Sequence, residues 1–296
     1  MLTTSICLSN DSICVVLGNV SRTKIKIQYA VYLKLPNGVI TNGMIANREL
    51  LIAALKNIYE NKNLPKKDVR FLVNSGSVLT KLVQVPVLPH KNLIEFTKST
   101  FSGVAPNYNH LLYDYAVVSP KTILCSAMER DLVESYANIF NDLGIKLYSL
   151  DIPLNCIIKI SRYFKALINK TYVISVLEGN SVFSVLFVNG EYTFSNVNFL
   201  MSDRGTPEWS GEIVRVISSL IQFNKSQKTE HEIGAAYFCG LSDEEQPICQ
   251  TIISELGIES ATLPTSKAVI VSKKMLSEGF LPTDHIFAIG NLVESK

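Results

Sequence analysis

The residues best able to do chemistry in this sequence include its six cysteines. None of them forms a Cys-x-x-Cys pair, and most stand in apolar segments such as residues 5–8 and 237–239. Disulfide frameworks are typical of short secreted chains, and this chain has 296 residues. Because a reduced thiol packs like a small apolar group, we expect all of them to be buried and reduced. They are Cys7, Cys14, Cys125, Cys156, Cys239 and Cys249.

The four histidines do not indicate a metal site. They show no His-x-x-x-His spacing and no nearby cluster of ligands, whereas zinc needs three or four ligands brought together. A Cys/His nucleophilic pair stays open, but no residue stands out for it. Gly-x-Ser-x-Gly, Walker A and Gly-x-Gly-x-x-Gly motifs are absent from the sequence. We therefore expect no catalytic residue and no metal. The histidines are His90, His110, His231 and His285.

Composition and charge exclude several classes of protein. The chain is 47% hydrophobic and 18% charged, which favours a sizeable core over disorder. Its net charge of +2 argues against a basic nucleic-acid-binding domain, so we expect no nucleic-acid partner. No apolar run approaches the roughly 18 residues that a membrane span needs. Residues 1–4 do not resemble the start of a secretion signal, so we expect a cytoplasmic protein.

Each half of the chain opens with predicted strands. Alternating or continuous apolar runs are separated by short turns, of which Asn10-Asp11, Glu178-Gly179-Asn180 and Asn189-Gly190 are the clearest. Three antiparallel strands are therefore expected at the start of each half. They are residues 3–9, 12–18 and 24–31 in the first half, and 172–177, 181–188 and 191–198 in the second.

Amphipathic helices follow these strands. Apolar residues recur at helical spacing, Asn47 stands at a suitable N-cap position, and Gly144 and Gly257 stand where helices end. The predicted helical segments are residues 51–58, 91–101, 130–143, 213–221, 246–256 and 282–293.

This order of elements predicts an α/β protein with two lobes. The segment from 69 to 128 has strands and one helix of its own, so it is expected to be a small inserted α+β subdomain. The first lobe is then residues 1–68 and 129–168, and the second is residues 169–296. Ligands tend to bind in the cleft between lobes.

Several short stretches match, in order, the pattern of a known family. A proline-flanked strand end before a helix and a proline turn before a Leu-Tyr-Asp-Tyr strand come first, and strand, helix and turn segments follow. The stretches are residues 85–89, 105–115, 126–147, 150–154, 213–227 and 237–258. On these residues the chain resembles a divergent member of the PilM family of type IV pilus assembly proteins. That family belongs to the FtsA/PilM branch of the actin-like ATPase superfamily.

The resemblance implies a two-lobed actin-like (ribonuclease H-like) fold with an inserted 1C-like subdomain. It also implies two phosphate loops, which fall on residues 7–14 and 175–181. In such loops an Asp organises Mg²⁺ and a Gly lets backbone N–H groups approach phosphate. Here Cys7 and Ser175 stand at the two Asp positions, Ser9 at the Gly and Cys14 at the Lys. The degenerate nucleotide-binding residues are then Ser9, Asn10, Asp11, Glu178, Gly179, Asn180, Ser181 and Gly240.

Loss of both metal-organising carboxylates removes charge neutralisation that phosphoryl transfer needs. We therefore expect a pseudo-ATPase without a cofactor, with ATP and Mg²⁺ as the alternative. Asp11 or Glu178 could replace the lost carboxylates from shifted positions, or could simply face solvent at their turns. Asp151 is a third candidate, or else a cap for the helix that starts near Pro153.

The resemblance implies a cytoplasmic scaffold for a type IV pilus or a related secretion or DNA-uptake machine. Such a scaffold docks the N-terminal tail of an inner-membrane PilN-like partner in a groove that involves the inserted subdomain, and it meets other pilus assembly components. The residues that contact the partner are not indicated. Residues 289–296 are too short and polar for an amphipathic anchor, so the chain is expected to lie at the inner membrane through its partner. The alternative function is an active actin-like ATPase or another nucleotide-switched protein of the same superfamily.

Overall fold

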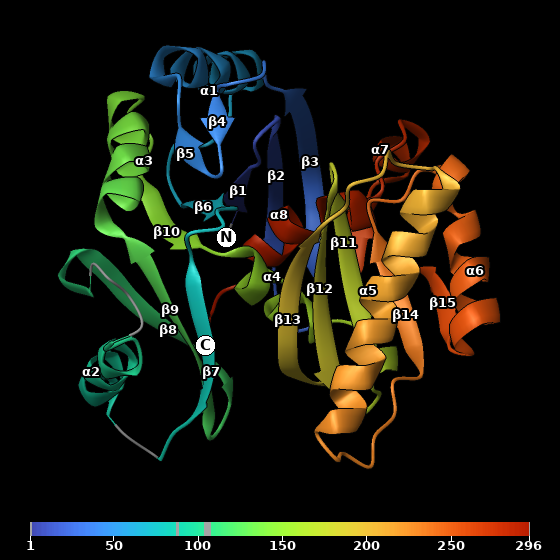
Figure 1. Cartoon of the computed structure of the whole chain (residues 1–296). Coiled ribbons are helices and arrows are strands. Elements are labelled where there is room, and N and C mark those ends of the chain that lie inside the picture. Colours follow the sequence, from blue (N-terminus) through green and yellow to red (C-terminus); the bar gives the residue numbers. More distant parts are fainter. Residues whose placement is uncertain (1, 87–88, 104–107, 296) are drawn as a thin grey trace. The chain divides into compact units, whose positions relative to one another are not determined.

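The computed structural model describes residues 2–86, 89–103 and 108–295, and the chain forms two compact units (Figure 1). Unit 1 is Met1–Ile160, Ile270–Phe280 and Phe287–Lys296. Unit 2 is Ser161–Val269 and Leu281–Ile286. None of the helices in the described part of the chain is long and apolar enough to span a membrane.

Unit 1 is built on a six-stranded sheet. Its order is β10 (Leu147–Asp151), β6 (Val69–Val73), β1 (Leu2–Leu8), β2 (Ser12–Val20), β3 (Ile25–Lys34) and β16 (Val269–Val271). The predicted hairpin is confirmed, because β1 and β2 pair antiparallel around the Asn10-Asp11 turn. β6 runs parallel to both β1 and β10.

Helices α1 (Arg48–Lys62) and α3 (Arg130–Asp142) pack their apolar faces in unit 1. The N-cap prediction for Asn47 is confirmed, since its Oδ1 accepts a hydrogen bond of 3.1 Å from Leu50 N. Buried aromatic rings join α3 to the sheet: the rings of Tyr136 and Phe140 each lie 4.8 Å from that of Phe71 on β6. The small elements of this unit are β4 (Ile40–Thr41), β5 (Met44–Ile45) and α7 (Lys273–Ser277).

The inserted subdomain has a sheet and a core of its own (Figure 1). Its strand order is β7 (Leu79–Gln84), β9 (Thr122–Glu129) and β8 (Leu111–Ser119), all antiparallel. Helix α2 (His90–Thr100) contacts β8 and β9, and η1 (Tyr108–His110) precedes β8. The core residues are Val85, Phe101, Leu111, Ile123, Cys125 and Ala127.

The insertion starts later in the chain than its predicted boundary at residue 69. Every residue of β6 is buried, and the strand lies inside the six-stranded sheet rather than in the subdomain. A strand whose residues are all buried is typical of a parallel sheet covered on both faces, which explains its place. Two pieces of the family pattern, Val87-Leu88 and Ala105-Pro106-Asn107, lie outside the described residues.

Unit 2 is built on a five-stranded sheet. Its order is β13 (Glu191–Phe199), β12 (Ser181–Val188), β11 (Tyr172–Glu178), β14 (Ala235–Cys239) and β15 (Glu259–Thr262). The three predicted strands are confirmed, and Asn189 and Gly190 both have the positive φ that a tight hairpin turn requires. Helices α5 (Pro207–Ser226) and α6 (Pro247–Leu256) share a core with the sheet that includes the fully buried Trp209. The short helices are η2 (Lys165–Leu167), η3 (Asp243–Glu245) and η4 (Pro282–His285).

The end of the chain returns to unit 1, whereas the sequence placed all residues from 169 onward in the second lobe. Helix α8 (Ile286–Asn291) explains the difference, because Phe287 and Ile289 are buried and Asn291 Nδ2 donates to Ser5 Oγ on β1 at 3.0 Å. At the other boundary, residues 161–168 belong to unit 2 rather than to the first lobe. All six cysteines lie in described residues and are buried thiols, as predicted.

Gly290 allows α8 to pack closely on α4 (Pro153–Ser161). A Cβ at this position would lie 2.3 Å from the carbonyl oxygen of Cys156. We expect Gly290→Ala to lower the free energy of unfolding by about 2 kcal/mol, the typical cost of overpacking a tight core. Chemical denaturation followed by circular dichroism measures it.

Gly211→Ala is the matched control for this prediction. Gly211 is also in a helix, but nothing lies within 4 Å of a Cβ added there. Alanine should therefore stabilise α5 by about 0.5 kcal/mol, through helix propensity alone. Equal effects of the two substitutions would contradict the close approach at Gly290.

Candidate functional site

The first of the two phosphate loops expected from the resemblance lies at the turn between β1 and β2, and its own side chains close it. Ser9 Oγ donates to Asp11 Oδ1 at 2.7 Å and lies 2.6 Å from Ser12 Oγ. Asn10 Oδ1 accepts a hydrogen bond of 3.3 Å from Gly43 N. Asn10 and Asp11 are exposed, so the one carboxylate of the turn faces solvent with an oxygen engaged by Ser9.

The strand ends beside this turn carry thiols where the family has charged groups. Cys7 on β1 stands opposite Cys14 on β2 in the strand register. Both are buried. A cysteine side chain is neither the carboxylate that holds Mg²⁺ nor the ammonium group that meets a phosphate.

The second expected phosphate loop lies at the turn between β11 and β12. Ser181 Oγ donates to the carbonyl of Glu178 at 2.8 Å, and the carbonyl of Asn180 accepts from Leu200 N at 2.7 Å. Ser175, at the second Asp position, is fully buried, and its Oγ lies 2.9 Å from Oγ of the equally buried Ser184. That hydroxyl is part of the sheet interior.

Gly240 lies directly after β14, and packing within unit 2 explains why it is glycine. Its φ is +78°, and a Cβ there would lie 2.6 Å from the carbonyl oxygen of Leu177 on β11. Arg204 Nη2 donates to the carbonyl of Gly240 at 2.8 Å. The backbone at this position is therefore engaged by the protein itself.

A partly buried ion pair beside Gly240 was not predicted from the sequence. Arg204 donates from Nε to Glu245 Oε1 at 2.7 Å and from Nη2 to Oε2 at 2.6 Å. Glu245 Oε2 also accepts from Ser242 N at 2.9 Å, in a capping box. Desolvation would raise the pKa of Glu245, but the hydrogen bonds from Arg204 and Ser242 hold it below its ordinary value. The Ser-x-x-Glu pattern was a signal for the cap, and none indicated the arginine.

Asp151 ends β10, and a lysine neutralises it. Lys159 Nζ lies 2.5 Å from Asp151 Oδ2, and the two side chains are only 3% and 11% exposed. Asp151 Oδ1 accepts from Ile152 N at 2.8 Å and from Asn155 Nδ2 at 2.9 Å. Its carboxylate is therefore held in a buried network at the start of α4, in which no sequence pattern indicated Lys159.

A second carboxylate, Asp114 on β8 of the insert, lies within electrostatic range of Asp151. Desolvation raises the pKa of Asp114, the backbone N–H of Tyr115 opposes the rise, and the charge of Asp151 adds to it. The next residue, Tyr115, packs its ring 5.4 Å from that of His90, the first residue of α2.

The two outer strands of the inserted sheet have open edges. In the part of the chain that the structure describes, β7 and β8 each pair only with β9. Edge strands present unpaired backbone N–H and C=O groups, to which an extended peptide can add. Across residues 2–86, 89–103 and 108–295, no group of three His, Cys, Asp or Glu side chains is placed as a metal site would need.

Solved structures identify the fold, although no family model and no curated protein sequence matches this chain. A PilM–PilN type IV pilus biogenesis complex is similar with a TM-score of 0.80 and 14% identity, over 98% of this chain and 97% of that one. A Bacteroides thetaiotaomicron protein of actin-like ATPase fold and unknown function has a TM-score of 0.56 and 13% identity, over 98% and 95%. The chain has a PilM-like actin-like ATPase fold.

This fold confirms the predicted architecture of two α/β lobes with an inserted subdomain. The ethanolamine utilization protein EutJ from Carboxydothermus hydrogenoformans is also similar, with a TM-score of 0.51 and 10% identity over 99% of this chain and 90% of that one. At these identities the comparisons establish the fold. Within the actin-like fold, the Ser9–Asp11 turn belongs to unit 1, while the Glu178–Ser181 turn and Gly240 belong to unit 2.

Proposed function

We propose that this protein is a docking scaffold of a type IV pilus or related secretion machine, which holds the cytoplasmic tail of an inner-membrane PilN-like protein. The observation that carries the proposal is the similarity to a PilM–PilN complex, with a TM-score of 0.80 over 98% of the chain. That share includes the inserted sheet. The protein would act on the cytoplasmic side of the inner membrane, held there by its partner.

The inserted subdomain supports this mode of binding. A tail that lies extended along β7 or β8 gains backbone hydrogen bonds, and pockets for alternate side chains select its sequence. Cytoplasmic segments of membrane proteins are enriched in Lys and Arg, to which the Asp114 carboxylate is complementary. Because the pKa of Asp114 is raised, this carboxylate is protonated at a higher pH than an ordinary aspartate. Its attraction to a basic tail should therefore weaken at a higher pH as well.

We infer further that docking does not use ATP. The residues at the degenerate loops do not fit Mg²⁺ and nucleotide: Cys7 and Ser175 are buried, neither is a carboxylate, and Ser175 pairs with Ser184. The backbone at Gly240 is already engaged by Arg204. Asp151, the remaining candidate, is neutralised by Lys159. The competing function is an ATPase that relies on the turn carboxylates Asp11 or Glu178.

Asp11→Ala and Glu178→Ala test the two functions against each other. We expect each variant to co-purify with the full-length PilN-like protein from detergent extracts as the unsubstituted chain does. Asp11→Ala removes one hydrogen bond at an exposed turn, which costs about 1 kcal/mol or less. Co-purification and pilus assembly are the measurements.

A stably folded Asp11→Ala or Glu178→Ala protein that no longer supports assembly would favour the nucleotide-dependent function. Failure of the unsubstituted protein to co-purify with the partner would overturn the docking proposal itself.

A further inference from the structure

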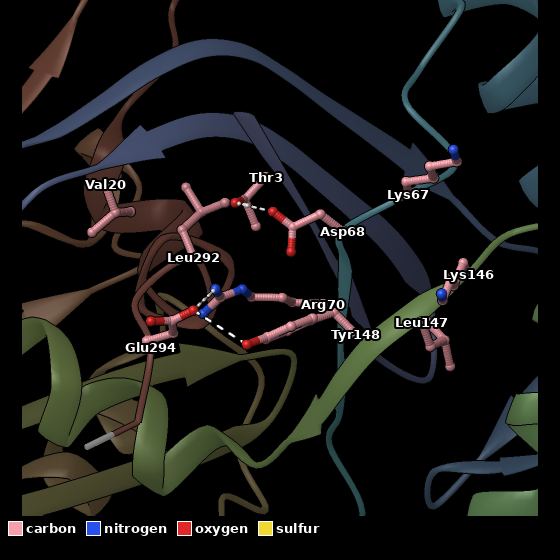
Figure 2. A pocket seen from close by; sticks show the side chains of 10 residues that line it. All are labelled: Thr3, Val20, Lys67, Asp68, Arg70, Lys146, Leu147, Tyr148, Leu292 and Glu294. Atoms are coloured by element: carbon pink, nitrogen blue, oxygen red, sulfur yellow. Dashed lines mark hydrogen bonds and ion pairs between the residues drawn. The ribbon is translucent and has the colours of Figure 1, made fainter. Parts of the chain in front are cut away.

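A pocket in unit 1 lies at the amino ends of the parallel strands β1, β6 and β10 (Figure 2). Thr3 near the start of β1, Asp68 just before β6 and Leu147 at the start of β10 are among the residues that line it. Its volume is about 480 Å³. The Ser9–Asp11 turn follows the opposite, carboxyl end of β1, so this pocket is separate from the degenerate nucleotide loop.

Arg70 is the main charged group of this pocket. It stands in β6, whose other residues are all apolar, and it is only 6% exposed. Among the described residues its Nε has no hydrogen-bond acceptor, although a guanidinium offers five donors. Its guanidinium carbon lies 5.2 Å from the centre of the Tyr148 ring. A buried cation with an unsatisfied N–H is costly unless an acceptor reaches it.

The anion that meets Arg70 is the side chain of Glu294, which is held loosely (Figure 2). Glu294 Oε1 accepts from Arg70 Nη2 at 3.0 Å and from the Tyr148 hydroxyl at 3.4 Å. The Glu294 side chain is 68% exposed, against 7% for Arg70. Arginine binds a carboxylate best through two parallel bonds, and Glu294 makes one.

The rest of the lining favours an anion with apolar neighbours. Lys67 and Lys146 add positive charge, while one oxygen of Asp68 already accepts the Thr3 hydroxyl at 2.8 Å. Without Glu294, the lining of the pocket would carry three basic side chains and a single carboxylate. Val20, Leu147 and Leu292 supply apolar surface in the same pocket, which is larger than one carboxylate needs.

We propose that the Arg70 pocket binds an acidic side chain, flanked by apolar residues, from a segment of another protein. Glu294 is the intramolecular stand-in for that carboxylate and swings out when the segment binds. Arg70 Nε and Nη2 then make the two parallel bonds that Glu294 leaves incomplete. This site does not depend on the proposed docking of a PilN-like tail, because it lies at a different edge and selects the opposite charge.

Nuclear magnetic resonance of the full chain tests the site, with the Nε–H signal of Arg70 as the readout. The probes are the capped peptide acetyl-Leu-Glu-Leu-amide, its Leu-Gln-Leu counterpart and inorganic phosphate. We expect only the Glu peptide to shift the Arg70 signal. Glu294→Gln should increase its affinity about tenfold by removing the competitor. Glu278→Gln, which removes an exposed carboxylate paired only weakly with Lys274 at 3.9 Å, should leave it unchanged.

Arg70→Gln should abolish binding, and it identifies the Arg70 signal if the variant folds. Glu294→Gln tests the proposal whether or not the Arg70→Gln variant folds. Because Glu294 is largely exposed, its substitution should leave the protein folded. No binding of the Glu peptide to the Glu294→Gln protein would overturn the proposal and leave Arg70 a structural residue. Equal binding of the Gln peptide, or stronger binding of phosphate, would overturn the proposed ligand class.

Discussion

A variant that lacks residues 79–127, with a short Gly-Ser linker in their place, is expected to lose at least 100-fold in affinity for the PilN-like tail. This segment contains all of β7, α2 and β8, together with most of β9. A 100-fold loss corresponds to about 2.8 kcal/mol, or roughly 110 Å² of apolar contact. Removing both strand edges on which the tail is proposed to dock should remove at least that much contact. Calorimetric titration with a synthetic tail peptide measures the loss.

The deletion leaves β6 in place, so a loss of binding can be attributed to the inserted subdomain and not to a damaged unit 1. Because the inserted subdomain has its own core, removing it leaves the six-stranded sheet of unit 1 complete. Circular dichroism verifies that the variant is folded. A finer comparison is Asp114→Asn, which should weaken binding of a basic tail, against Glu95→Gln on the exposed face of α2, which should not. If the folded deletion variant bound the tail with unchanged affinity, the docking site would lie outside the inserted subdomain.

Lys159→Met is expected to lower the free energy of unfolding by about 3–5 kcal/mol. The substitution leaves the Asp151 carboxylate buried without its counter-charge, and breaking a buried ion pair from one side costs this much. The two hydrogen bonds to Asp151 Oδ1 do not replace the lost charge. Urea unfolding followed by far-UV circular dichroism gives the value.

Two controls belong to this measurement. In the double variant Asp151→Asn, Lys159→Met no charge is left buried, so most of the stability should return. Lys56→Met removes a lysine paired with Glu60 on the surface of α1, where both side chains are more than half exposed, and should change stability by less than about 0.5 kcal/mol. A Lys159→Met protein as stable as the Lys56→Met protein would show that solvent reaches Asp151, which would revive it as a catalytic candidate.

Much of the fold was predictable because its signals are local. Asn189-Gly190 specifies a tight hairpin through backbone conformations that few other residues adopt, and both have positive φ in the structure. Asn47 and Gly257 mark the start of α1 and the end of α6 in the same way, through hydrogen bonds made within one turn. Elements that carry such markers appeared close to their expected residues.

The misplaced segments are those whose position depends on distant partners. β6 is short, and nothing in its sequence, Val-Arg-Phe-Leu-Val, indicates which sheet will pair with it. Helix α8 joins unit 1 through contacts such as the one between Asn291 and Ser5, which are 286 residues apart. Local patterning does not encode such a pairing, so the end of the chain was assigned to the lobe that precedes it.

The turns of the candidate site were predictable from the sequence, whereas the ion pairs near them were not. Cys7 and Ser175 could be seen in the sequence to stand where carboxylates are expected. The ion pairs found in the structure join residues that are far apart in the sequence. Arg204 and Glu245 are separated by 41 positions, and Arg70 and Glu294 by 224. A charged residue in a strand usually indicates a solvated face, which is why the buried Arg70 was not recognised.

The most direct test is calorimetric titration of the tail peptide into the purified, folded protein, with and without ATP and Mg²⁺. Docking without nucleotide predicts binding of the tail with the same dissociation constant in both conditions, and no heat from ATP and Mg²⁺ alone at millimolar concentration. Tail binding that appears only with ATP, or micromolar binding of ATP itself, would contradict it and identify a nucleotide-switched protein.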